Sequence, residues 1–100
     1  MPERHSSERS RAVLAIGHAG SVLLVEAASG RVLWARSLTD LPAGAPCDGQ
    51  PVEVEIVEEL VIAACMGQVF ALSLEDASLL WQVNRRGRGE GATSIAVKRE

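Results

Sequence analysis

The residues best suited to chemistry are few and scattered along this chain. Glu53 and Glu55 lie two positions apart, so both carboxylates would project from one face of an extended strand. Paired carboxylates can perform general acid–base chemistry, but they are far more common on the solvated face of a strand. The sequence contains no serine–histidine–aspartate set, metal-binding motif or nucleophile motif. It therefore predicts no catalytic residue, no metal site and a protein that is not an enzyme.

His18 and Cys65 occupy matching positions in two similar segments, at an offset of 47 residues (65 − 18). If both faced a central channel, they could form a ring of soft metal ligands across an assembly. The alternative is that both are ordinary residues at the edge of a turn. Cys47 and Cys65 show neither metal-type nor redox-type spacing, and we expect both to be free thiols.

Arginines and glycines are interleaved in one late segment of the chain. They are Arg85, Arg86 and Arg88, with Gly87, Gly89 and Gly91. A glycine-rich loop can cradle phosphate when a helix follows it, and none is expected here. The arginines could instead contact an acidic partner, such as the acidic strand of a neighbouring copy. The alternative is a solvated loop.

Composition limits the class of protein. The chain has 100 residues, of which 47% are hydrophobic, and a net charge of −3. These values suit one small domain with a core, and the mild charge identifies no nucleic-acid partner. No apolar run approaches the roughly 18 residues that would span a membrane. Residues 1–11 read as a flexible polar tail without the apolar segment of a signal peptide, so we expect a cytoplasmic protein.

An internal repeat dominates the sequence. Val13–Trp34 aligns without a gap on Leu60–Trp81, at an offset of 47 residues (81 − 34). Two glycines and two tryptophans coincide, and most other matched positions keep their apolar character. A period of about 40–50 residues filled with short strands is typical of a β-propeller.

Short strands separated by turns account for the whole repeat, and no segment has helical periodicity. Gly20 and Gly67 are expected to supply the positive φ of hairpin turns. Val13–Gly17 is continuously apolar, which predicts a strand buried on both faces, whereas Val52–Val57 alternates as a half-exposed strand does. The expected strands are Val13–Gly17, Val22–Glu26, Arg31–Ser37, Val52–Val57, Leu60–Cys65, Val69–Leu74, Ser78–Asn84 and Thr93–Lys98.

These residues resemble the quinoprotein-type (PQQ-like) propeller repeat, whose units end in a Gly turn followed by a strand with Leu-Trp. Val22–Trp34 matches this pattern well, with Gly30 at the turn glycine. The second copy has Asp76 and Ala77 where the family has Thr-Gly, so we expect a less regular turn there. The resemblance implies that Trp34 and Trp81 pack between neighbouring blades, in equivalent and largely buried environments.

The order of strands predicts two four-stranded antiparallel blades that are circularly shifted. The first copy lacks its first strand, and Thr93–Lys98 resembles such a strand at the other end. That strand would pair with Val13–Gly17, in the same chain or in another. A closed propeller typically needs four to eight blades. We therefore expect residues 12–100 to form a two-blade domain completed by oligomerisation, with a small open sandwich or a fragment of a longer protein as alternatives.

The resemblance favours an eight-bladed ring, hence a tetramer of this chain. The small residues Ala15, Ala63 and Ala64 would also permit a six-bladed trimer. We expect a non-catalytic interaction or scaffolding module that self-associates, binds no cofactor and can present a rim to another protein. The alternatives are a small-ligand or glycan-binding propeller and a fragment of a quinone-dependent dehydrogenase.

Overall fold

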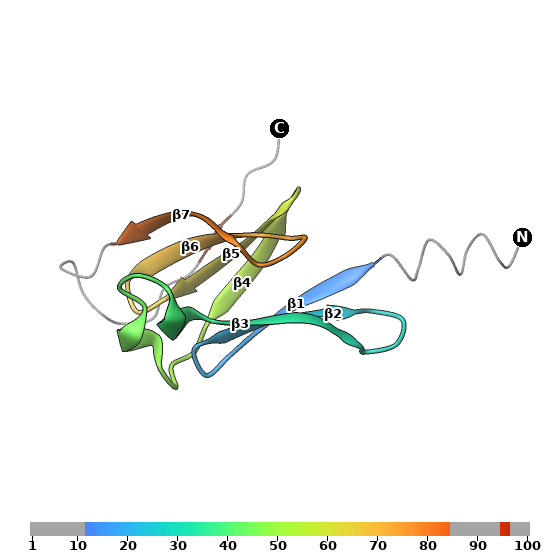
Figure 1. The fold of residues 1–100 in the computed structure, drawn as a ribbon, viewed down its shortest axis with the longest axis horizontal. Helices are drawn as coiled ribbons and strands as arrows, with labels where there is room; N and C mark the ends of the chain where they lie inside the picture. Colours follow the sequence, from blue (N-terminus) through green and yellow to red (C-terminus); the bar gives the residue numbers. More distant parts are fainter. Residues whose placement is uncertain (1–11, 85–94, 97–100) are drawn as a thin grey trace, which may run out of the picture.

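The protein is all-β, as the sequence predicts, and its strands form two antiparallel sheets (Figure 1). The computed structural model describes residues 12–84 and 95–96. The first sheet has the order β1-β2-β3 and the second β4-β5-β6-β7. The strands are β1 (Val13–His18), β2 (Ser21–Glu26), β3 (Val32–Ser37), β4 (Glu53–Val57), β5 (Leu60–Cys65), β6 (Gln68–Ser73) and β7 (Leu79–Asn84).

Two parts of the predicted architecture fall largely outside this description. The predicted tail, residues 1–11, lies outside the described residues, and so does most of the expected last strand, Thr93–Lys98. Ile95 and Ala96 are described and are not assigned to a strand. The arrangement of three strands followed by four is therefore observed, while the predicted fourth strand of the first blade is not.

Matching tight turns join the first two strands of each three-stranded repeat unit. Ala19 and Gly20 have φ of 50° and 82°, and Met66 and Gly67 have φ of 51° and 78°. Two successive positive φ values characterise the two-residue hairpin turn whose twist suits β-strands, and glycine adopts such values without steric cost. The turns join β1 to β2 and β5 to β6 with the same register.

The second pair of turns is also equivalent, contrary to expectation. Ala77 adopts a φ of 67°, close to the 76° of Gly30. The N–H of Gly30 bonds to the Glu26 carbonyl at 2.7 Å, and that of Ala77 bonds to the Ser73 carbonyl at 2.8 Å. The prediction of a less regular second turn was wrong, because the hydrogen-bonded framework holds an alanine in the left-handed region that glycine would occupy more easily.

A β-bulge follows each of these turns and sets the orientation of the tryptophans. Leu24 pairs with Trp34 while Val25 pairs with Val32, which leaves Leu33 as the extra residue. The second sheet has the same irregularity, with Leu80 as the extra residue before Trp81. A bulge of this kind changes which face of the sheet a strand's side chains occupy.

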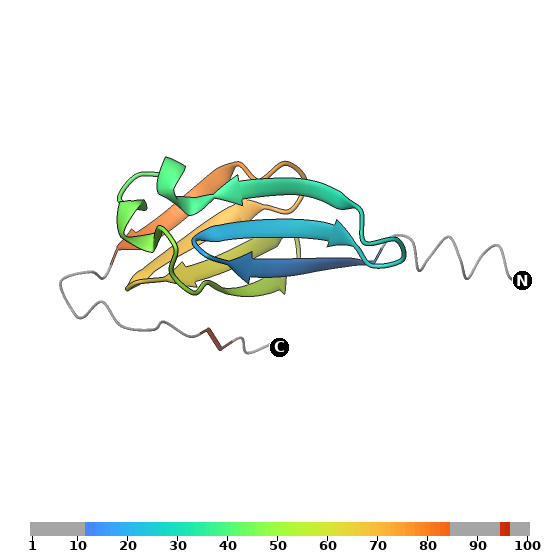
Figure 2. The same cartoon turned by 90° about the horizontal axis from the view of Figure 1, so that it is seen from below.

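The two sheets stack face to face around one core (Figures 1 and 2). Val22 and Leu24 of the first sheet meet Val61, Phe70 and Leu72 of the second. All five side chains are at most 3% exposed. Apolar surface removed from water at this contact is the main source of stability in a chain of this size.

The connection between the sheets closes one end of the core. It contains the 3-10 turns η1 (Leu38–Asp40) and η2 (Ala45–Cys47), with Leu38 and Cys47 fully buried. Gln68, also fully buried, donates to the Ala43 carbonyl and accepts a hydrogen bond from Gln82 at 3.1 Å. These bonds satisfy a buried amide and fix the loop against β6 and β7.

One predicted burial pattern is wrong. β1 is covered on one face only, since its residues alternate between half-buried and exposed along the strand. Its apolar run was expected to be buried on both faces. β5, the matching strand of the second sheet, comes closest to that expectation, because every residue after Leu60 in it is buried.

Candidate interaction faces

Each sheet has two faces, and each face has an equivalent on the sheet of the other repeat. We call the face that carries Trp34 or Trp81 the Trp face, and the opposite one the far face. The Trp face of the first sheet packs on the far face of the second. The far face of the first sheet and the Trp face of the second therefore point outward, on opposite sides of the two-layer structure (Figure 2).

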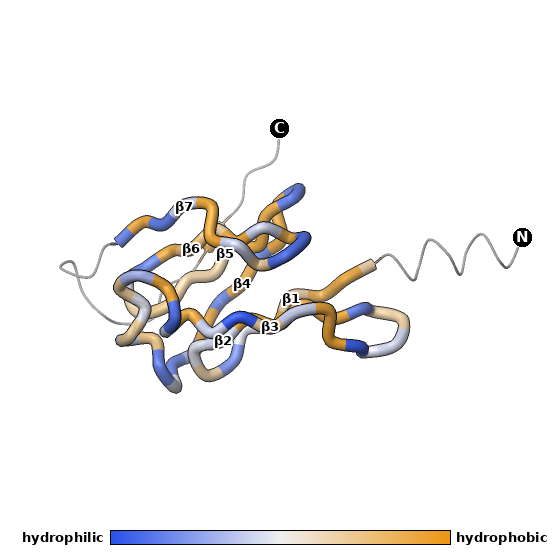
Figure 3. Tube along the Cα trace, in the orientation of Figure 1, coloured by the Kyte–Doolittle hydropathy of each residue, from blue (hydrophilic) through white to orange (hydrophobic). Residues whose placement is uncertain are grey.

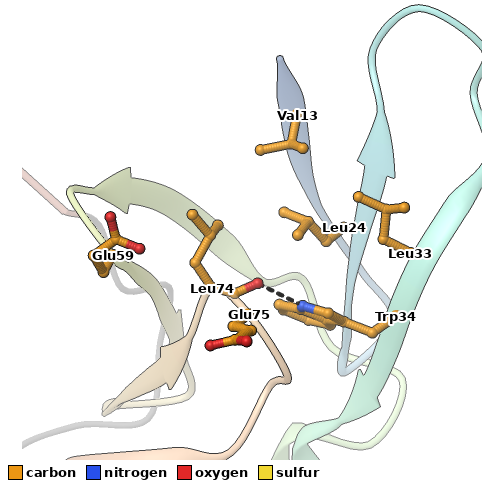
Figure 4. A pocket seen from close by; sticks show the side chains of 7 residues that line it. All are labelled: Val13, Leu24, Leu33, Trp34, Glu59, Leu74 and Glu75. Atoms are coloured by element: carbon orange, nitrogen blue, oxygen red, sulfur yellow. Dashed lines mark hydrogen bonds between the residues drawn. The ribbon is translucent and has the colours of Figure 1, made fainter. Parts of the chain in front are cut away.

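Trp34 lies in the contact between the sheets. Its indole Nε1 donates a hydrogen bond of 2.8 Å to the Leu74 carbonyl, which follows β6 (Figure 4). Beside the ring is an open pocket between the two sheets. Its lining is Val13, Leu24, Leu33, Trp34, Glu59, Leu74 and Glu75. The tryptophan therefore joins the sheets both by apolar contact and by one directional bond.

Trp81 occupies the matching position on the second sheet, but its environment differs. Its side chain is 46% exposed, whereas Trp34 is half-buried and packed against the core. The expectation of equivalent, largely buried environments therefore does not hold within one chain. The physical reason is that Trp34 has a second sheet against it and Trp81 has none among the described residues.

The Trp face of the second sheet is apolar across β5, β6 and β7. Val83, on the same face as Trp81, is 43% exposed. It matches Arg36, whose Nε is buried without a hydrogen-bond partner in the covered interface. Ile62 and Ala71 on this face are already buried. The exposed copy of the face is thus more apolar at this position than the covered one.

The far face of the first sheet is also apolar and open to solvent. Leu14 is 53% exposed, Ile16 42% and Val32 51%. The tube of Figure 3 is coloured as hydrophobic along most of β1 and β7. Exposed apolar surface gathered on one sheet face is a candidate for an interaction site.

The outer edge of β1 has no neighbouring strand within residues 12–84 and 95–96. β1 is the terminal strand of its sheet. The His18–Ser21 pair that closes the hairpin is hydrogen-bonded, so bonding pairs alternate and the backbone groups of Val13 and Ala15 point away from β2. Such an edge can pair with another strand.

The other candidate site residues that the sequence suggested do not lie together in one site. His18 is exposed at the far face of the first sheet, whereas its counterpart Cys65 is buried in the core. They therefore lie in different environments in this chain. Glu53 and Glu55 share the Trp face of β4, where a Glu53 carboxylate oxygen accepts a hydrogen bond of 3.1 Å from the Ile95 N–H.

The arginine- and glycine-rich segment cannot be placed. Arg85, Arg86, Arg88, Gly87, Gly89 and Gly91 all lie outside the described residues. Within the part of the chain that the structure describes, no group of three or more His, Cys, Asp or Glu side chains could hold a metal ion. No helix in that same part is long and apolar enough to cross a bilayer.

Sequence reasoning missed Leu14 and Ile16 as exposed apolar residues. It treated β1 as a strand covered on both sides, because the run is apolar without interruption. The signal that distinguishes the two faces is His18, which has the same alternation phase as Leu14 and Ile16. A histidine where the second copy has Cys65 indicates that this face is open in the first sheet.

The two cysteines are free and buried. The Cys47 thiol donates a 3.4 Å hydrogen bond to the Cys65 carbonyl. Burial, followed by the interactions with Cys65, raises the pKa of Cys47 to about 12, and burial also raises the pKa of Cys65. Both thiols are therefore protonated and unreactive at neutral pH in the folded chain.

No protein-family model and no curated protein matches the sequence. The resemblance to the quinoprotein-type repeat therefore stays a prediction. The structure itself contributes the finding that both turns, the bulge and the tryptophan recur in the two sheets.

Trp34→Ala should lower the free energy of unfolding by about 3–5 kcal/mol, because it removes a large ring from the contact between the sheets. Trp34→Phe keeps most of the packing and should lose about 1 kcal/mol, for the indole hydrogen bond alone. Trp81→Ala is the matched control, and at concentrations where the chain is monomeric it should change stability little. Urea titrations of the three variants measure these differences. Equal losses for Trp34→Ala and Trp81→Ala would contradict the asymmetry of the two sites.

Stability should fall at alkaline pH through the buried thiols. The unfolded thiol ionises near pH 8.5 and the folded Cys47 thiol near pH 12, so the contribution is complete below about pH 8.5 and is lost as pH rises towards 12. Each such thiol adds a slope of about 1.4 kcal/mol per pH unit in that window. Urea titrations between pH 7 and 11 measure it, and Cys47→Ala should flatten the slope. An unchanged slope in that variant would show that Cys47 does not titrate as described.

Proposed function

We propose that this protein is a non-catalytic, propeller-type interaction module that self-associates and serves as a scaffold. The observation that carries the proposal is the pair of outward apolar faces. Over the three strands that the two sheets share, they match the two faces that are buried against each other inside the chain. A chain that exposes both halves of its own internal contact can bind further copies of itself.

Each sheet then counts as one blade of a propeller. The shared turns, bulge and tryptophan support this interpretation, because a repeated unit that covers its neighbour in a constant way generates a ring or a solenoid. Two blades in each chain allow six blades from three copies or eight from four. The edge of β1 fits this scheme, since among the described residues the first blade has one strand fewer than the second.

The absence of a catalytic role is part of the proposal. His18, Cys65 and the Glu53–Glu55 pair are each separated or engaged in structural contacts, so they supply no acid–base or nucleophilic set. The free and buried thiols fit a reducing compartment, which supports a place in the cytoplasm. The scaffold would offer its loops and outer strands to another protein.

The test is the mass of the full chain in solution, measured by light scattering over a range of concentrations. The proposal predicts a mass that rises to a defined multiple of the monomer mass of 10.6 kDa, three-fold or four-fold for a closed ring. A chain that stays monomeric up to about 1 mM would have no self-association of biological strength, and the proposal would be wrong.

A further inference from the structure

We infer that the Trp face of the second sheet binds the far face of the first sheet of a second copy, with the Trp81 indole donating to the Ala27 carbonyl of that copy. The inference rests on the proposed self-association and specifies its geometry. It follows from using the contact inside the chain as a template. The residues of β1–β3 and of β5–β7 in that contact have counterparts 47 positions away, as Trp34 and Trp81 do, whereas β4 has no counterpart in the first sheet.

The hydrogen bond is the most specific element of the template. Trp34 donates to the Leu74 carbonyl at 2.8 Å. The counterpart of Trp34 is Trp81, and the counterpart of Leu74 is Ala27 (74 − 47). The Leu74 N–H bonds to the Glu59 carbonyl at 2.9 Å, and the Ala27 N–H bonds to the Ala12 carbonyl at the same distance. The Ala27 carbonyl is thus held by the same local structure as the Leu74 carbonyl, and Ala27 is exposed.

The apolar surfaces on either side of this bond also have counterparts in the proposed contact between copies. Val22 and Leu24 in the covered Trp face correspond to Val69 and Ala71 in the outward one, where Val69 is half-buried and Ala71 is buried. On the receiving side, the buried far face of the second sheet has apolar counterparts in the first sheet, of which Leu14, Ile16 and Val32 are exposed and Val25 is buried. In order, Val61, Ala63, Phe70, Leu72 and Leu79 correspond to Leu14, Ile16, Leu23, Val25 and Val32. All of these counterparts are apolar, although their individual volumes differ.

The rim of the contact inside the chain differs from the rim of the contact between copies. Inside the chain, Glu59 and Glu75 line the pocket beside Trp34. Their counterparts are Ala12 and Ala28. The contact between copies would therefore have an apolar rim where the internal one has two carboxylates. At these two rim positions no carboxylate would lose its hydration, whereas Glu53 and Glu55 lie on the β4 part of the same Trp face.

The position of Ile95 agrees with this geometry. Its N–H bonds to Glu53, which lies on the Trp face of the second sheet, away from the first sheet of the same chain. The open edge of β1 in the same chain lies on the other side of the second sheet. A second copy seated on the Trp face would instead bring its own β1 edge to the side where Ile95 and Ala96 lie.

Such a contact joins two different surfaces, so it is head-to-tail. Two charge variants separate it from a symmetric dimer. Trp81→Glu blocks the Trp face of the second sheet, and Leu14→Glu blocks the far face of the first. Both side chains are about half exposed in the single chain, at 46% and 53%, so neither change alters the core. Ala45→Glu places the same charge on the exposed connecting loop and is the matched control.

Light scattering on each variant and on an equimolar mixture gives the test. We expect the wild type and Ala45→Glu to associate, each blocked variant to be monomeric, and the mixture to form a 1:1 dimer, because it restores one intact pair of faces. Trp81→Phe, which keeps the ring and loses the N–H, should weaken association by about five-fold. Circular dichroism and the fluorescence of Trp34 verify that each variant is folded.

Three results would contradict the inference, and each excludes a different part of it. If one blocked variant still forms an oligomer alone, or if the mixture stays monomeric while the wild type associates, the head-to-tail geometry is wrong and self-association stands. An undiminished affinity in Trp81→Phe would refute the hydrogen bond to Ala27. A wild type that is monomeric at every concentration would remove both this inference and the proposed function.

Discussion

The packing of one sheet on the other is the contact on which the rest of this structure depends. A single sheet of three or four short strands cannot bury enough apolar surface to offset its conformational entropy. Here the Trp face of the first sheet and the far face of the second cover each other, with Phe70 and Leu72 fully buried between them. The bond from Trp34 to the Leu74 carbonyl adds direction to a contact that is otherwise non-directional. It fixes which part of one sheet lies over which part of the other.

The same physics explains why the outer faces are apolar. Burial of apolar surface does not depend on whether the covering sheet belongs to the same chain. A repeat that builds its core by covering one face with the next unit leaves one face open at each end, as the terminal units of repeat arrays do. In this chain the open ends carry Leu14 and Trp81 rather than the polar residues that would cap an array.

Much of the fold could be predicted from the sequence, because the repeat and the turns are local signals. The seven strands that the structure describes were all expected, and Gly20 and Gly67 take the positive φ that their hairpins need. The turn at Ala77 could not be predicted, since its geometry is imposed by hydrogen bonds across the strands rather than by the residue itself. Likewise, the apolar run of β1 does not show that only one of its faces is covered, and His18 at its end is the one residue that distinguishes them. The site was predicted less completely. The two tryptophans were singled out correctly as paired positions, but the difference between them depends on what lies opposite each one, which is tertiary information. The buried Gln68, which fixes the connecting loop, was also missed, because a glutamine at a turn reads as an exposed residue.

The most direct measurement of the central claim is the behaviour of the two indole N–H signals in ¹H–¹⁵N spectra recorded at low and high protein concentration. The signal of Trp34 should be protected from solvent exchange at both concentrations, because its bond to Leu74 lies within the chain. The signal of Trp81 should exchange freely in the monomer and become protected, with a shift towards that of Trp34, as copies associate. If Trp81 stays unprotected in an associated sample, the Trp face of the second sheet is not the surface that binds, and the head-to-tail contact is wrong.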